Sequence, residues 1–253
     1  IVVTHRDSEQ ILGPIGTFTR HPALYETLRR VDQANGESLM AAVSSKGAFR
    51  YTDKMFADHP EASELIPSGS SNMIVGFSNL PFLWHIDRPK DGSVYANMHG
   101  LDSTKRASRF IRRDYVTGPE SFDKWNVAMA KGNGTGSTTD FFGLPLTKPF
   151  VLGPGVGVTL TFMTIGAFDS EEEANACLRY LKTKFARAML GVLKVTPDNA
   201  RGTWKHVPLQ VFTSASDIDW SKSIPEIDHQ LYAKYKLDVD EIAFIGSNVK
   251  PME

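Results

Sequence analysis

The segment 165–195 constrains the fold most, because it joins a helix start signal to an apolar stripe at helical spacing. Ser170 and Glu173 match a capping box, in which two side chains satisfy unpaired backbone N–H groups of the first turn. Acidic residues come early in the segment and basic residues late, as the helix dipole favours. The stripe consists of Ala174, Cys177, Leu178, Leu181, Phe185, Ala188, Met189 and Val192. We therefore expect a long amphipathic helix over 170–194.

The flanking regions differ from this helix and from each other. Short strand-like runs, punctuated by Gly, Pro, Asn and Asp, occupy 72–79, 82–86, 93–97, 124–130 and 156–165. Helical patterns cover 22–36, 224–237 and 238–249, and 207–212 reads as a further strand. The chain therefore predicts an α+β fold, in which an irregular β-rich core with a mixed sheet is clasped by the long helix and the C-terminal helices. We expect 1–38 to be an N-terminal helical or linking segment and 39–253 to be one compact domain.

Size and charge narrow the class of protein. With 253 residues, of which 41% are hydrophobic, the chain can bury a sizeable core. A net charge of −1 argues against a uniformly basic nucleic-acid binder but permits a local basic face. Cys177 is the single cysteine, which predicts a reducing, cytoplasmic location, and no apolar run is long enough to predict a membrane span. The chain starts at Ile1 without a leader, so we expect it to be part of a longer protein.

Two basic clusters are candidate phosphate-binding surfaces. Arg201, Lys205 and His206 surround Trp204 in one of them. The other lies between 105 and 113 and contains Lys105, Arg106, Arg109, Arg112 and Arg113. Clustered cations neutralise the phosphates of a nucleic-acid backbone. The competing interpretation is a solvated face whose cations pair with nearby acids, and the sequence leaves both open.

Two glycine-rich segments resemble phosphate-binding loops only in part. The segment 131–140, KGNGTGSTTD, lacks the Gly-Lys-Ser/Thr ending of a P-loop, and no clear helix follows it. The segment 151–157, VLGPGVG, contains a proline and precedes a strand. We therefore interpret 131–140 as a loop that closes on a larger ligand, and a mononucleotide site is the weaker alternative.

A catalytic constellation is missing from the sequence. Its histidines are scattered, and it contains neither a nucleophile elbow nor the Asn/Asp-Pro-Pro-Tyr/Phe tetrapeptide with which methyltransferases hold a flipped adenine. Asp217 with Asp219, or Asp238, Asp240 and Glu241, could in principle hold a hard cation, but helix capping and surface exposure are the simpler explanation of these acids. We therefore predict no catalytic residue, cofactor site or metal site in this chain.

Most of the chain from about residue 39 onwards resembles the C-terminal target-recognition region of type II restriction–modification N6-adenine DNA methyltransferases. The matching pieces are the Val-Ser-Ser-Lys stretch 43–46 with Phe49, the segments 110–137 and 165–196, Trp204 with 207–212, and the ending 240–252. Ala48 and Arg50 depart from the family, which usually has Pro and Gly there, and Val211 stands where an acid is common.

The resemblance implies a division of labour within a longer adenine-specific enzyme, which in some members also cleaves DNA. An upstream methyltransferase domain would bind S-adenosylmethionine and flip the adenine, while this chain would bind double-stranded DNA without catalysis of its own. Our residue assignments for that contact are inferences from charge and loop position. They are Lys46, Lys105, Arg106, Arg109, Arg112, Arg113, Lys131, Arg201 and Lys205 for phosphates, and Asn133, Thr135 and Ser137 for base edges.

Two other classes of function remain open at this stage. One is a restriction endonuclease domain that cleaves DNA with Mg²⁺ through an unrecognised acid cluster. The other is a protein-assembly module, in which the basic segment 105–113 meets an acidic partner. A neutral total charge with local basic clusters is compatible with either alternative.

Overall fold

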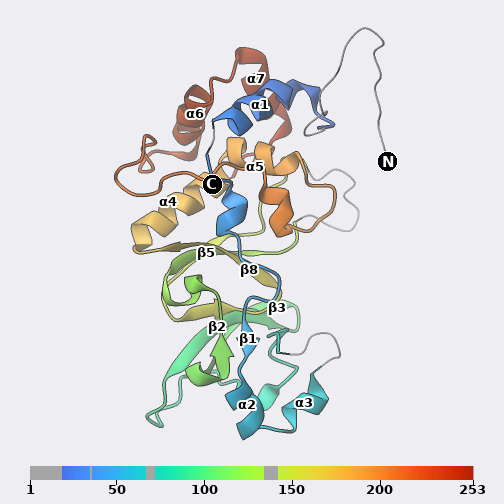
Figure 1. The fold of residues 1–253 in the computed structure, drawn as a ribbon, viewed down its shortest axis with the longest axis vertical. Helices are drawn as coiled ribbons and strands as arrows, with labels where there is room; N and C mark the ends of the chain where they lie inside the picture. The colour runs from blue at the N-terminus through green and yellow to red at the C-terminus, as the bar shows by residue number, and fades with distance from the viewer. Residues whose placement is uncertain (1–18, 35, 67–71, 134–141, 253) are drawn as a thin grey trace.

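A three-stranded antiparallel sheet crosses the middle of the protein in the order β6 (Phe150–Leu152), β5 (Trp125–Ala130), β8 (Phe162–Phe168) (Figure 1). The computed structural model describes residues 19–34, 36–66, 72–133 and 142–252. Successive side chains of β5 enter different cores: Val127 and Met129 face the helical side, and Ala128 faces the opposite side. Both faces are therefore buried, which explains why this strand is apolar without alternation.

A layer of helices covers one face of this central sheet (Figure 1). It consists of α1 (Tyr25–Gln33), α4 (Glu171–Lys182), α5 (Lys184–Gly191), α6 (Ile224–Lys234) and α7 (Val239–Asn248). Of these helices, α4 packs directly against all three strands of the sheet. The short 3-10 helices η1 (Pro22–Leu24), η2 (Leu39–Ala42) and η6 (Arg201–Trp204) complete this side.

A second sheet covers the other face and completes the second core. Its central strand β2 (Tyr95–Asp102) pairs antiparallel with β3 (Lys105–Arg112) and parallel with β7 (Val156–Val158). The remaining elements on this side are β1 (Arg50–Tyr51), β4 (Val116–Thr117), α2 (Asp53–Asp58), α3 (Ala62–Leu65), η3 (Pro81–Leu83), η4 (Arg113–Tyr115) and η5 (Glu120–Asp123). The predicted α+β fold with a mixed sheet is confirmed.

The helix predicted as continuous over 170–194 is instead two helices, so that prediction is wrong in its extent. It starts as expected, because the Ser170 hydroxyl accepts a hydrogen bond from the Glu173 N–H at 3.2 Å. Thr183 then adopts an extended backbone with ψ 150° and ends α4. Its hydroxyl donates to the Tyr180 carbonyl at 2.7 Å and accepts from the Ala186 N–H at 3.1 Å. Thr183 therefore caps both helices, and such local bonds compete with helix propagation.

Three segments predicted as strands form no strand, and each buries only some of its apolar residues. Segments 72–79 and 82–86 contribute Ile74 and Leu83 to the second core, where both residues are buried. Pro81 begins the 3-10 helix η3 in the second of these segments. Segment 207–212 runs beside residues 37–39 and exchanges only two backbone hydrogen bonds with them. Apolar, β-prone composition in these segments reflects burial rather than strand pairing.

The first described residues belong to the helical core and do not form a separate linker. Leu24, Leu28 and Val31 are buried in the same cluster as Phe185. The Thr27 hydroxyl also donates to the Glu241 carboxylate of α7 at 2.7 Å. The helical character expected within 1–38 is seen in α1, and the expected domain boundary at residue 38 stays a prediction. Among the described helices, none is both long and apolar enough to cross a membrane.

Asp228 of α6 holds the start of α5, and its removal should destabilise the protein. Its carboxylate accepts the N–H groups of Lys184 and Phe185, each at 2.9 Å, and only 5% of the residue is exposed. We expect Asp228→Ala to lower the free energy of unfolding by about 2–3 kcal/mol, since two buried donors lose a charged acceptor. Denaturant titration measures the change. Asp240→Ala, at an exposed position, is the control, and equal effects of the two substitutions would contradict this assignment.

Candidate nucleic-acid interface

The basic cluster at 105–113 is divided between the two faces of the β2–β3 hairpin. Arg106 lies opposite Leu101, and Arg109 lies opposite Met98 in the antiparallel register. Because side chains alternate along a strand, Arg106 and Arg112 share one face while Lys105 and Arg109 share the other. The cations at 105–112 therefore do not all point to the same side of this hairpin.

Three arginines of this cluster are paired with acids. Arg109 bonds Asp102, Arg112 bonds Asp114 at 2.6 Å, and Arg113 bonds Asp123 at 3.0 Å. Each guanidinium also lies over an aromatic ring, closest for Arg113, which is 4.0 Å from the ring centre of Phe122. Such partly exposed pairs contribute little stability, but they offset the charge available to a phosphate. This geometry matches the competing interpretation, in which the cations of the cluster pair with nearby acids on a solvated face.

A second group of cations converges where three segments meet beside the central sheet. Lys131 directly follows β5, and its carbonyl accepts the Asn199 N–H at 2.6 Å. Partial burial lowers the pKa of Lys131, and the nearby charge of Lys46 lowers it further, while Asp198 acts in the opposite direction. The charge of Lys46 therefore acts on Lys131, and an anion beside the two would offset this repulsion.

Arg201 extends this group towards the helical layer. It begins η6, and its Nε donates to the Met40 carbonyl of η2 at 2.9 Å. Lys46 follows η2 by four residues, in the segment that continues to β1 (Figure 1). Lys205 comes one helical turn after Arg201 and is exposed. Three of the phosphate contacts predicted outside the hairpin therefore lie on neighbouring segments, and Lys131 joins them through Asn199.

Arg106 joins the group from the hairpin side. Its guanidinium donates to the carbonyls of Lys148 at 3.0 Å and Thr147 at 2.9 Å. The Thr147 hydroxyl in turn donates to the Gly132 carbonyl at 3.0 Å, one residue after Lys131. We define the basic strip as Arg106, Lys131, Lys46 and Arg201.

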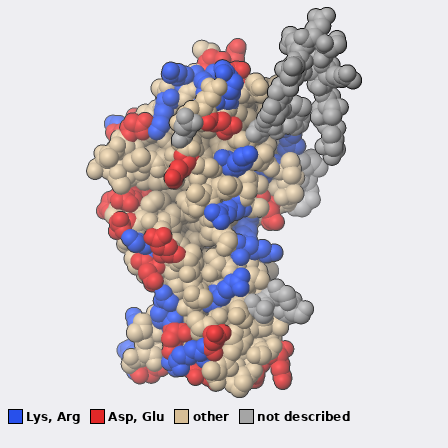
Figure 2. All heavy atoms as spheres, viewed as in Figure 1, with Lys and Arg blue, Asp and Glu red and all other residues tan. Residues whose placement is uncertain are grey.

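The basic strip differs from the hairpin cluster in its lack of acidic partners. Among the residues that the structure describes, no carboxylate lies within 4.0 Å of a charged nitrogen of its four members. Figure 2 shows basic side chains following one another down the middle of one face, with acidic side chains at its left edge and also in its upper and lower parts. A chain with a net charge of −1 thus separates its charges locally.

Asn133, predicted to contact base edges, is an interior residue, and that prediction is wrong. It is 1% exposed, and its Oδ1 accepts from Asn199 Nδ2 at 3.0 Å and from the Thr147 N–H at 3.2 Å. These bonds hold the Asn133 side chain in the interior, so it cannot contact a base edge. The other two predicted base contacts, Thr135 and Ser137, lie outside the described residues.

Lys194 is a buried cation whose place the sequence pattern did not predict. In the sequence, Lys194 is a basic residue at the end of the helix predicted over 170–194. In the structure, α5 ends at Gly191 and only 2% of Lys194 is exposed. Its Nζ donates to the carbonyls of Pro197 at 2.8 Å and Asp198 at 2.9 Å, and to Asn199 Oδ1 at 2.7 Å. The turn at 197–199 immediately after Lys194 was the available signal, since it brings these oxygens within reach.

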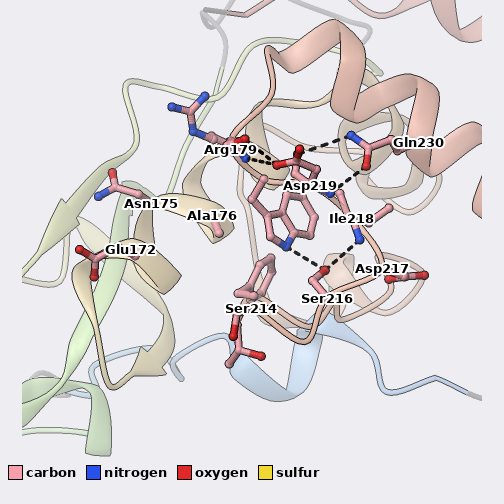
Figure 3. Close-up of a pocket in the computed structure, with 14 residues that line it drawn as sticks. Glu172, Asn175, Ala176, Arg179, Ser214, Ser216, Asp217, Ile218, Asp219 and Gln230 are labelled. Atoms are coloured by element: carbon pink, nitrogen blue, oxygen red, sulfur yellow. Dashed lines mark hydrogen bonds between the residues drawn. The ribbon is translucent and has the colours of Figure 1, made fainter.

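A groove of about 770 Å³ lies elsewhere, between α4 and the loop 212–221 (Figure 3). Its polar groups largely bond one another: Gln230 accepts the Asp219 N–H at 2.8 Å, and Trp220 Nε1 donates to the Ser216 hydroxyl at 3.0 Å. Arg179 is the one cation in its lining, which also includes three acids. The charge of this groove is therefore unsuited to a phosphate backbone.

The acids considered as cation ligands have other partners. Asp217 bonds Lys234 at 2.8 Å, and Asp219 accepts from the Ser221 hydroxyl. Asp238 and Glu241 form a reciprocal capping box at the start of α7, with both bonds at 2.8 Å. Within the described part of the chain, no group of three or more His, Cys, Asp or Glu side chains is placed to hold a metal ion.

The glycine-rich segment 151–157 connects two strands. It contains the end of β6, a turn and the start of β7, and Gly155 has φ +76° at that turn. A positive φ favours glycine, so the turn explains this residue. No helix starts after it, and the arrangement lacks the helix N-terminus that phosphate-binding glycine loops use.

The chain was compared with protein-family models, curated proteins and solved structures, and none of them matches it.

The burial of Lys194 predicts a defined pH dependence of stability. Burial lowers its pKa to about 8, whereas an unfolded lysine titrates near 10.4. Between these values the unfolded chain binds more protons at this site than the folded chain, so the free energy of unfolding rises with pH. We expect the free energy of unfolding of the wild type, minus that of Lys194→Met, to increase by about 2 kcal/mol from about pH 7.5 to about pH 10. Denaturant titration at each pH measures it, and a difference that stays constant or falls would contradict the shift.

Proposed function

We propose that this chain recognises double-stranded DNA as the target-recognition region of an adenine-specific DNA methyltransferase of a restriction–modification system. The observation that carries the proposal is the basic strip, four cations without acidic partners among the described residues. Lysine and arginine side chains that neutralise phosphates supply much of the affinity of proteins for duplex DNA. The resemblance of the chain to that region supports the proposed parent enzyme.

The proposal assigns the methyl transfer to a different domain. S-adenosylmethionine would bind an upstream methyltransferase domain, and this chain would hold the duplex while a base is flipped into that domain. In this chain, Lys46, Lys131, Arg106 and Arg201 would contact phosphates and set the register of the duplex. Base readout would come from residues beside the strip that contact the grooves, which Asn133 does not because it is buried.

Different experimental outcomes would support the two alternative functions, an endonuclease domain and a protein-assembly module. Specific cleavage of plasmid DNA by this chain with Mg²⁺ would support an endonuclease domain and overturn a purely recognising role. Binding that an acidic peptide competes for better than a DNA duplex does would support a protein-assembly module instead. Duplex binding without cleavage, resistant to the peptide, is the result that we expect.

Removal of two strip cations should weaken duplex binding and its salt dependence together. In Lys46→Gln/Lys131→Gln we expect about tenfold weaker affinity and a slope of log K against log salt that is smaller by about 2, since two phosphate contacts are lost. Fluorescence anisotropy with a labelled duplex at several salt concentrations measures both quantities.

The matched control removes two lysines that are paired with acids elsewhere. Lys54 bonds Asp58 at 2.8 Å and Lys124 bonds Asp169, so Lys54→Gln/Lys124→Gln removes the same formal charge outside the strip. We expect this control to keep the wild-type slope. If both double variants bind the duplex equally well, the strip is not the phosphate-binding surface.

The hairpin arginines should contribute less than the strip. In Arg109→Gln/Arg112→Gln, we expect the affinity to fall less than about threefold, because Asp102 and Asp114 already offset these charges. The same anisotropy titration measures the change. A loss as large as that of the strip variant would make the hairpin the phosphate-binding surface and restore the assignment made from the sequence.

A further inference from the structure

A buried hydrogen-bond network lies directly beneath the basic strip. Its first part is the Lys194 ammonium, which donates to three oxygens of residues 197–199. An ammonium has three protons to donate, so each proton of Lys194 has an acceptor in this arrangement. The turn at 197–199 is therefore fixed from the interior by one charged side chain.

The second part of the network carries this constraint to Lys131. Asn199 Nδ2 donates to the Ala130 carbonyl at 3.2 Å and to Asn133 Oδ1 at 3.0 Å. The backbones of the two segments also pair, because the Asn199 N–H bonds the Lys131 carbonyl and the Asn133 N–H bonds the Pro197 carbonyl at 2.8 Å. Lys131 thus lies between two residues whose positions depend on Asn199.

The third part reaches the other end of the strip. The Thr147 hydroxyl donates to the Gly132 carbonyl, and the Thr147 N–H donates to Asn133 Oδ1. The Thr147 carbonyl accepts from the Arg106 guanidinium at 2.9 Å. One contiguous set of hydrogen bonds therefore joins buried Lys194 to exposed Arg106 by way of Asn133.

We propose that Lys194, Asn199 and Asn133 are positioning residues of the DNA interface, which hold Lys131 and Arg106 at a fixed spacing from inside the protein. The inference rests on the proposed function, since the spacing matters only if these cations contact successive phosphates. Its physical basis is that a buried, fully satisfied polar network is rigid, whereas a partly satisfied one leaves polar groups unpaired. Burial also lowers the pKa of Lys194 to about 8, so that the ammonium remains largely charged at neutral pH.

A double-mutant cycle tests this inference through DNA binding. In Lys194→Met we expect duplex affinity to fall about as much as in Lys131→Gln, because Lys131 is no longer held in place. Adding Lys131→Gln to Lys194→Met should then cost less than about twofold, whereas adding Lys46→Gln should cost its full effect. Independent, additive losses for Lys194 and Lys131 would overturn the positioning role.

A second measurement does not depend on DNA. Amide hydrogen exchange at Asn133 and Asn199 reports the pairing of their two segments, and it should accelerate at least about tenfold in Lys194→Met while the α6 amides stay protected. Thr147→Val tests the same network from an exposed position, so folding is preserved, and it should accelerate exchange at Asn133 alone. Unchanged exchange at these amides in both variants would overturn the inference.

The two readouts separate failure of this inference from failure of the proposed function. If the wild-type chain binds no duplex but exchange accelerates as expected, the proposed function is overturned and the positioning of Lys131 by Lys194 stands. If the wild-type chain binds duplex and the cycle is additive, the proposed function stands and the positioning role is overturned.

Discussion

The rest of the structure depends on the burial of the central β6–β5–β8 sheet on both of its faces. Because helices cover one face and a second sheet covers the other, its strands are mostly apolar, with Asn126 and Thr164 as buried polar exceptions. Lys131 is the first residue after β5. Ser44 donates its N–H to the Thr164 carbonyl on β8 at 2.8 Å, which sets the course of the chain to Lys46. The same sheet that divides the two cores therefore fixes where the basic strip lies.

Pairing, rather than the number of charges, distinguishes the two cationic regions. The hairpin has more basic residues, yet Asp102, Asp114 and Asp123 each hold one of its arginines. The strip has fewer cations, but its described surroundings leave them without carboxylate partners, and burial keeps Lys131 partly desolvated. Within the described residues, an incoming phosphate would have no directly paired carboxylate to displace at the strip, where Asp198 acts on Lys131 only from beyond ion-pair distance. At the hairpin it would have to displace one, which reduces the gain in free energy.

The sequence predicted the features that periodicity and capping determine. These include the α+β class, β5, and the helix start at Ser170, each of which follows from local pattern. It failed at Thr183, whose local bonds to Tyr180 and Ala186 break a helix whose stripe runs through it, with long-range help from Asp228 of α6. The site followed the same rule. Each cation of the basic strip was predicted from local charge in the sequence. The tertiary fold decides the rest: the convergence of these cations, the acids that pair with the hairpin arginines, and the burial of Asn133.

The central claim is that four cations, which have no carboxylate partner among the described residues, form a surface that neutralises DNA phosphates. Its most direct test is the salt dependence of duplex binding by the intact, unsubstituted chain. Four phosphate contacts predict that log K falls linearly with log salt with a slope of about −3 to −4, largely independent of the duplex sequence. Affinity that does not change with salt, or no measurable binding to duplex DNA even at low salt, would contradict the claim.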